Sequence, residues 1–263
     1  MAETGRLTRS PAFAAGNPVL LLRVGLIGAA LAIWQAVSVS GLLFRDVVPS
    51  LAAIAGALGR LLLDAGFYGH LGTTGFEILV ALAIGGLSGL VVGLALGGNR
   101  LLGKAFEPYL YYLGPTPKII FFPVMIMWFG VGPGSKVAMG VISCFFPIAL
   151  STAAGMRQID RVLIRVGRSF RANIWQMVSK IYLPAMREPI VNGVRLGLGV
   201  AVIGTLLAET KLSNKGVGFL VINSYSTFDM PRMYALLTVV FVIAIGVNAL
   251  VSRFAGGRAN TKS

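Results

Sequence analysis

Apolar runs long enough to cross a membrane as helices, about 20 residues each, recur along the chain and limit its fold more than any other feature. Inside a hydrocarbon layer only helices and closed barrels can satisfy their backbone polar groups. The composition agrees, because 56% hydrophobic and 12% charged residues in a chain of 263 are too apolar for an ordinary water-soluble domain. The sequence predicts an all-α, polytopic membrane protein.

Six of these runs are predicted to be transmembrane helices. We expect them at residues 18–39, 77–98, 105–129, 134–155, 188–209 and 233–253. The stretch 50–66 is apolar but short, and Arg60 and Asp64 mark a polar side, so it is expected to form an amphipathic helix outside the spans.

These spans imply a division of the chain into four parts. Residues 1–17 are expected to be a disordered cytoplasmic tail, and residues 18–68 hold the first span and the amphipathic helix. The transport core is expected at 69–254, with a cytoplasmic loop at 157–187, and a second cytoplasmic tail at 255–263.

Lysine and arginine predict the orientation, because they are enriched in the loops on the cytoplasmic side. With the N-terminus inside, fifteen of the 23 Lys and Arg residues fall on the cytoplasmic side and six on the outer side. Lys118 and Arg195 lie inside spans. We therefore expect both termini in the cytoplasm.

The segment 157–187 concentrates positive charge on the cytoplasmic side. It contains seven basic residues: Arg157, Arg161, Arg165, Arg168, Arg171, Lys180 and Arg187. Apolar residues recur beside them at helical spacing: Phe170, Ile174, Met177, Val178 and Ile181. Asn173 is predicted to cap a helix that starts near Ile174, and Pro184 to end it. We therefore expect two short helices separated around residues 171–173, which either lie on anionic lipid or dock a cytoplasmic partner.

Several blocks of the sequence resemble one family of membrane proteins. The stretch 165–171 aligns with a cytoplasmic motif of the form E-A-A-x-x-x-G, followed by a match of residues 181–184, Ile-Tyr-Leu-Pro, to I-x-L-P. Residues 115–136, 153–160 and 206–229 resemble further blocks of the same group, in the same order. Over about residues 45 to 254 the chain is similar to permease subunits of binding-protein-dependent ABC importers, in the sulfonate, nitrate and taurine group.

This resemblance implies a type I ABC importer permease fold with six spans, in a bacterial inner membrane. It implies that the loop contacts an ATPase through Arg165, Val166, Gly167, Ser169, Phe170, Arg171, Ala172 and Trp175. The implied partners are a second permease subunit, identical or different, two ATPase subunits that bind ATP and Mg²⁺, a periplasmic solute-binding protein and membrane lipid.

The loop departs from the family motif at two positions. Arg165 replaces an acidic residue, and Arg171 replaces a glycine whose backbone freedom Arg does not share. There are three alternative explanations for the replacements. The docking geometry is altered, the ATPase carries compensating acidic residues, or the chain pairs with a different permease subunit that keeps the standard motif.

Four residues are candidates for the translocation path of a small, anionic solute: Lys118, Trp128, Phe129 and Glu209. Each has a structural alternative. Lys118 can instead bind carbonyl groups that Pro115 and Pro117 leave unpaired. Trp128 and Phe129 fit an interfacial aromatic belt, and Glu209 can pair with nearby lysines.

Other function classes are disfavoured by what the sequence lacks. No G-x-x-x-x-G-K-[ST] loop and no catalytic acid–base set is present, so neither a membrane enzyme nor ATP binding by this chain is expected. No nucleic-acid module is visible, and His70, expected in an outer loop, has no companions for a metal site. A secondary transporter is the main alternative, although that class usually places several ionisable residues near mid-membrane, where Lys118 is nearly alone.

Overall fold

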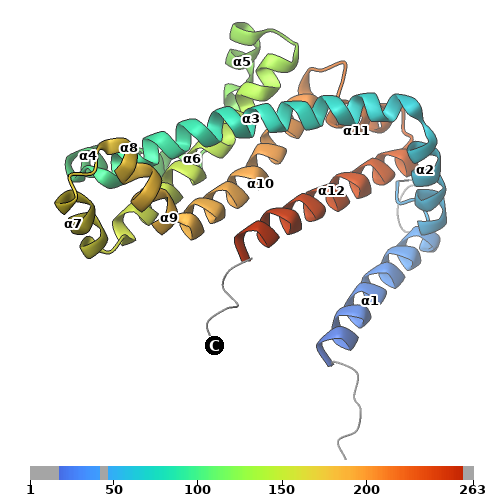
Figure 1. Ribbon diagram of the computed structural model, residues 1–263. Coiled ribbons are helices and arrows are strands. Elements are labelled where there is room, and N and C mark those ends of the chain that lie inside the picture. The colour runs from blue at the N-terminus through green and yellow to red at the C-terminus, as the bar shows by residue number, and fades with distance from the viewer. Residues whose placement is uncertain (1–17, 42–46, 257–263) are drawn as a thin grey trace, which may run out of the picture. The chain divides into compact units, whose positions relative to one another are not determined.

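The computed structural model describes residues 18–41 and 47–256, and every regular element in these ranges is a helix (Figure 1). The chain divides into two compact units, residues 1–56 and 57–263. The N-terminal elements are α1 (Pro18–Ser40), α2 (Leu51–Leu63), α3 (Ala65–Gly98) and α4 (Arg100–Leu113). They are followed by η1 (Lys118–Phe121), α5 (Phe122–Phe129), α6 (Pro133–Gln158), α7 (Arg161–Ser169), α8 (Ile174–Met177), η2 (Val178–Tyr182), α9 (Leu183–Ala185), α10 (Arg187–Lys211), α11 (Val217–Ser226) and α12 (Met230–Gly256).

In the first unit, the C-terminal part of α1 is hydrogen-bonded to the start of α2. The indole N–H of Trp34 donates to the carbonyl of Pro49 at 3.0 Å. The side-chain oxygen of Gln35 accepts from the backbone N–H of Leu51 at 3.1 Å. Gln35 thereby satisfies one of the free N–H groups with which every helix begins.

In the second unit, α6 lies between α3 and α10 and forms the centre of the core. Four glycines of α3, spaced four residues apart, face α6: Gly85, Gly89, Gly93 and Gly97. A Cβ atom at any of them would lie 2.6–2.9 Å from a backbone carbonyl oxygen of α6. Only glycine permits this backbone approach, which is a common way for membrane helices to pack.

The direction of each core helix follows from these contacts. Gly85 meets Cys144 and Gly97 meets Met156, so α3 and α6 run in parallel. On α10, Gly193 meets Ser151 while Gly204 meets Ser143, so α10 is antiparallel to both. The bundle consequently has one end that carries α7, α8 and α9 and an opposite end that carries α11 (Figure 1). We refer to them as the α7 end and the α11 end.

Several helices begin at side chains that accept hydrogen bonds from their first N–H groups. Asp64 accepts from Gly66 before α3, and Asn99 accepts from Leu101 and Leu102 before α4. Asp160 accepts from Val162 before α7. Short polar residues at these positions are favoured because their side chains reach the N–H groups of the first turn.

The predicted spans are recovered in number and approximate position. Within residues 18–41 and 47–256, five helices, α1, α3, α6, α10 and α12, are long and apolar enough to cross a membrane. The predicted third span, 105–129, is a pair, α4 and η1–α5, bent by 92° at the Pro-containing segment between them. The predicted count of six is reached when this pair is one broken span. The amphipathic helix predicted at 50–66 is α2.

Two boundary predictions were wrong. The second span begins at Ala65, twelve residues earlier than expected, so His70 lies inside α3 rather than in a loop. Pro184 is not the last residue of the helical segment that starts at Ile174, because the segment continues through η2 and α9 to Ala185, one residue further. The tail predicted at 1–17 lies outside the described residues, as does the one predicted at 255–263 apart from its first two residues, which end α12.

Candidate functional site

The turn between α7 and α8 is the first feature of the predicted docking loop. The N–H of Arg171 donates to Arg168 O at 2.9 Å, and the N–H of Ala172 donates to Gly167 O at 3.0 Å. These two bonds form a Schellman motif, which requires a left-handed residue at the position of Arg171. Arg171 indeed has φ +49°. The backbone therefore takes the glycine-like conformation although the residue is arginine.

The predicted helix start at Asn173 is confirmed. Asn173 Oδ1 accepts from Gln176 N at 2.8 Å, and Gln176 Oε1 accepts from Asn173 N at 2.9 Å, which forms a capping box. Beyond α8, Met177 and Ile181 pack against Gly167 of α7, where a Cβ atom would lie 2.4 Å from Ile181 Cδ1. The loop 157–187 therefore contains two short helices held together by their own contacts.

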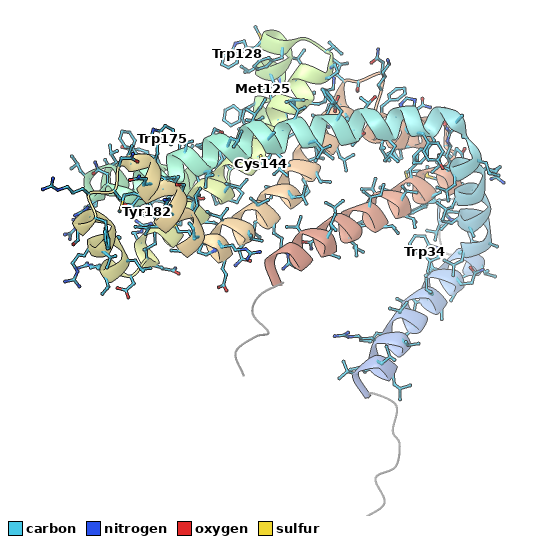
Figure 2. The ribbon with its side chains drawn as sticks, viewed as in Figure 1. Trp34, Met125, Trp128, Cys144, Trp175 and Tyr182 are labelled. Carbon is cyan, nitrogen blue, oxygen red and sulfur yellow. The ribbon has the colours of Figure 1, made fainter. Side chains whose placement is uncertain are left out.

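The surface of this loop is apolar and basic. Phe170, Ile174 and Trp175 are 81%, 68% and 78% exposed, and Figure 2 shows Trp175 on α8 at the α7 end. Met177, predicted on the same apolar face, is buried instead. Of the eight predicted docking residues, six are exposed: Arg165, Val166, Ser169, Phe170, Arg171 and Trp175. Ala172 is half-buried, and Gly167 is buried, so Gly167 supports the loop from within.

Arg157, counted with the loop in the sequence, has a different position. It lies in the last turn of α6, where its guanidinium makes a bidentate ion pair with Glu107 of α4. Bidentate pairs of this kind fix geometry as well as charge. Arg157 therefore joins the first half of the broken span to the core helix that leads into the loop.

Lys118 lies in the bend of the broken span. Its ammonium group donates to Gly114 O and, at 3.4 Å, to Thr116 O, and it lies 5.2 Å from the ring centroid of Phe146. These contacts are those of the structural alternative, in which Lys118 pairs carbonyl groups of a Pro-broken helix. Contact between Lys118 and a solute stays a prediction.

Trp128 and Phe129 form the exposed end of α5. They are 71% and 54% exposed, and Figure 2 shows Trp128 on this helix beside Met125. Met125 is buried against α6, so α5 has one face on the core and one face free within this chain. A place for Trp128 and Phe129 in the translocation path stays a prediction.

Glu209 is buried in the core rather than paired with Lys211 or Lys215, which are exposed. Its carboxylate accepts from Thr74 Oγ1 and from the backbone N–H of Gly218, both at 2.6 Å. The alternative of a local ion pair was therefore wrong, and Glu209 instead joins α3, α10 and α11.

Lys136 and Glu77 were missed as site residues by the sequence analysis. Lys136 was counted among the outer loop charges, yet it is 1% exposed, and its ammonium group donates to three carbonyls, those of Val131, Gly132 and Leu212. Glu77 is 2% exposed, and Glu209 is 0% exposed. We call these three residues, Glu77, Lys136 and Glu209, the charge layer.

The charge layer changes the argument against a secondary transporter. That argument was based on the isolation of Lys118, but the described residues include four further buried charged side chains, the charge layer and Glu107. The hydrogen bonds of Lys136 and Glu209 go to backbone groups and to the Thr74 hydroxyl. No group of three or more His, Cys, Asp or Glu side chains within the described residues is arranged to hold a metal ion.

The sequence is similar to those of known transport proteins. Residues 83–257 match the family described as binding-protein-dependent transport system inner membrane component. The putative aliphatic sulfonates transport permease protein SsuC of Escherichia coli K12 is 30% identical over 238 residues, covering 89% of this chain and 84% of that protein. The taurine transport system permease protein TauC of the same organism is 29% identical over 243 residues, covering 88% of each.

A solved structure has the same arrangement of helices. A chain of the MetNI methionine ABC transporter, in an inward-facing conformation, aligns with 76% of this chain and 100% of its own length. The TM-score is 0.60 at 20% sequence identity. This likeness confirms the predicted fold.

Proposed function

Because this chain belongs to the family of binding-protein-dependent transport system inner membrane components, we propose that it forms half of the membrane path of an importer for a small anionic solute. It is a permease subunit, and ATP is hydrolysed by a separate subunit. A second permease, identical or different, completes the path. Two ATPase subunits, which bind ATP and Mg²⁺, dock at the α7 end, and a periplasmic solute-binding protein docks at the α11 end.

The orientation is part of this proposal. The protein lies in a bacterial inner membrane, its lipid-facing surface in contact with the bilayer, with the α7 end and both termini in the cytoplasm. The transport core comprises residues 69–254. An anionic solute is favoured by the two Escherichia coli relatives, a putative permease for aliphatic sulfonates and a permease for taurine, because both solutes carry a sulfonate group.

One observation supports the docking role of the loop above the others. Phe170, Ile174 and Trp175 are large apolar side chains that the loop exposes to water at the α7 end. Aromatic side chains of this kind are typical anchors of protein interfaces. The capping box and the Schellman motif hold them on short helices, which can transmit a displacement that a flexible loop could not.

The proposal is tested by placing charges on this surface. We expect the double variant Phe170→Asp, Trp175→Asp to lose co-purification with the ATPase subunit, because two carboxylates in an apolar interface remain unpaired and desolvated. The control is Tyr225→Asp on α11, also an exposed aromatic, which should retain the ATPase. Normal co-purification of the double variant with the ATPase subunit would contradict the docking role of this surface.

A further inference from the structure

A cavity of about 240 Å³ lies at the α11 end, between the C-terminal part of α2 and the residues with which α3 and α12 begin. Two of its lining residues are apolar and belong to the hydrophobic cluster that packs α2, α3, α11 and α12 together. The other four are charged, two of each sign. The full lining is Ala57, Arg60, Leu61, Asp64, Asp229 and Arg232. The cavity therefore combines an apolar support with a charged wall, and it shares no residue with the charge layer or the loop 157–187.

The two carboxylates of the cavity are held in place by the helices that they cap. Asp64 Oδ1 accepts from the N–H of Gly66 at 2.9 Å, at the start of α3. Asp229 Oδ1 accepts from the N–H of Arg232 at 3.2 Å, in the first turn of α12. Each cap uses one oxygen, and an ionised carboxylate offers two oxygens that accept several hydrogen bonds between them. Both side chains are therefore fixed and can still accept from a cationic group in the cavity.

The two guanidinium groups of the cavity have few acceptors within the chain. Arg232 Nη2 lies 3.9 Å from Asp64 Oδ2, which is too long for a hydrogen bond. Among the described residues, the Arg60 side chain forms neither a hydrogen bond nor an ion pair. Guanidinium groups present planar sets of N–H donors that match the oxygens of carboxylates and phosphates. Two of them on one cavity wall can therefore bind an anion that carries several oxygens.

The surroundings place the cavity at the level of the lipid headgroups. Along α12, no charged residue occurs between Arg232 and Arg253, and this interval of a helix is about 32 Å long, close to the thickness of the hydrocarbon layer, about 30 Å. Arg232 therefore lies at one boundary of that layer. At the end of α2, Leu62 and Leu63 are 46% and 88% exposed, as suits contact with lipid. Tyr68, whose hydroxyl donates to Leu62 O at 2.8 Å, is 53% exposed, and tyrosine is enriched at membrane–water interfaces.

A ligand that carries both charges suits the cavity better than an anion alone. A phosphate group can pair with Arg60 and Arg232, but the carboxylates of Asp64 and Asp229 repel it unless the same ligand also brings a cation. A primary ammonium group donates three hydrogen bonds and so matches carboxylate oxygens. A quaternary ammonium group has no N–H and is recognised by aromatic faces, yet none of the six lining residues is aromatic. The lining therefore favours a phosphate joined to a primary ammonium group.

We propose that this cavity binds a phospholipid whose headgroup joins a phosphate to a primary ammonium group, the chemistry of phosphatidylethanolamine. The phosphate pairs with Arg60 and Arg232, and the ammonium group donates to Asp64 and Asp229. Because these side chains come from α2, from the residue before α3 and from the start of α12, the bound lipid holds the three helices together. This inference goes beyond the proposed function, since it depends neither on the solute nor on the ATPase.

The site is tested by thermal unfolding of the purified, delipidated full-length chain in detergent, because a ligand that binds only the folded state raises the melting temperature. The probes are phosphatidylethanolamine, phosphatidylcholine and phosphatidylglycerol with identical acyl chains. We expect phosphatidylethanolamine to raise the melting temperature by about 2–5 °C more than either of the other two lipids. Equal shifts with the three lipids, or no shift with any of them, would overturn the proposal.

Two double variants test the two halves of the site separately. Arg60→Gln, Arg232→Gln removes both cations. Asp64→Asn, Asp229→Asn removes both negative charges but keeps the side-chain oxygens that cap α3 and α12, so the fold is preserved. In each variant, the advantage of phosphatidylethanolamine over phosphatidylcholine should disappear. If the asparagine variant keeps this advantage, the ammonium group is not bound by the two carboxylates and the proposal is wrong.

Three further measurements separate this lipid from other occupants. The double variant Lys211→Gln, Lys215→Gln removes two exposed cations from the same end of the bundle and should keep the full shift with phosphatidylethanolamine, whereas loss of the shift would mean that any positive surface suffices. Glycerophosphoethanolamine, the same headgroup without acyl chains, should give no shift at the same concentration, and an equal shift would point to a soluble ligand instead. If Arg60→Gln, Arg232→Gln loses only the capture of the periplasmic binding protein and keeps every lipid shift, the cavity docks a protein and the lipid site is refuted.

Discussion

Two residues of this protein adopt a backbone conformation that their side chains disfavour. Among the described residues, Arg171 with φ +49° and Phe228 with φ +59° are the non-glycine positions with positive φ. Both follow the same rule: the N–H groups of Phe228 and Asp229 donate to Tyr225 O and Ser224 O, which is again a Schellman motif at a helix C-terminus. The hydrogen bonds of the motif therefore outweigh the strain, about 1–2 kcal/mol per residue.

Replacing Arg171 by glycine should stabilise the protein. Glycine takes a left-handed conformation without steric cost, and its own entropic cost, about 0.5–1 kcal/mol, offsets only part of the gain. We expect the melting temperature to rise by about 1–4 °C. Arg168→Gly, one turn earlier and inside α7, should instead destabilise by about 1 kcal/mol. A melting temperature that falls in both variants would show that Arg171 makes contacts worth more than the strain.

At the scale of elements, α6 packs closely in the centre of the core because its neighbours α3 and α10 present glycines to it rather than large side chains. Gly93 of α3 is the tightest example, because a Cβ atom there would lie 2.5 Å from Thr152 Cβ and 2.6 Å from the carbonyl oxygen of Ala149. Backbone atoms cannot move aside as a flexible side chain can. The α3–α6 pair is therefore expected to move as one body.

Gly93→Ala should consequently destabilise the protein by about 1–3 kcal/mol, the usual cost of overpacking a core. The matched control on the same helix is Gly72→Ala, where nothing lies within 4 Å of the added Cβ. That substitution should stabilise by about 0.5–1 kcal/mol, because alanine restricts the unfolded chain. The measurement is the thermal denaturation of the two variants. A Gly93→Ala variant as stable as the unmodified protein would mean that α3 and α6 separate easily.

The spans and the two short helices of the loop 157–187 could be predicted because their signals are local in sequence. Apolar length indicates a span, and Asn173 indicates a cap, within a few residues of the element concerned. The charge layer could not be predicted in this way, because Glu77 and Glu209 are 132 residues apart. Taken alone, each is interpreted as a polar residue at the end of a span. Similarly, Lys136 follows a Gly-Pro segment and resembles a loop charge. Only the packing of three helices brings their side chains together.

At the scale of the second unit, the two ends differ in exposed positive charge. The α7 end carries six exposed basic side chains: Arg161, Arg165, Arg168, Arg171, Lys180 and Arg187. At the α11 end, Lys136 is buried in the charge layer, and Arg232 lies 3.9 Å from Asp64 in a half-exposed ion pair. This difference favours the α7 end as the cytoplasmic one.

The orientation can be measured with two cysteines at opposite ends of the bundle. In a Cys144→Ala background, Ser169→Cys lies on α7 and Asn214→Cys lies in the loop before α11, and both positions are exposed. Because an impermeant thiol reagent reaches only the outer face of intact spheroplasts, it should label Asn214→Cys at once and Ser169→Cys only after permeabilisation. Cys144 itself is fully buried, so its removal should not disturb either position. Equal labelling of both cysteines before permeabilisation would contradict six spans with cytoplasmic termini. Labelling of Ser169→Cys alone would show the opposite orientation, with the loop 157–187 on the outer side.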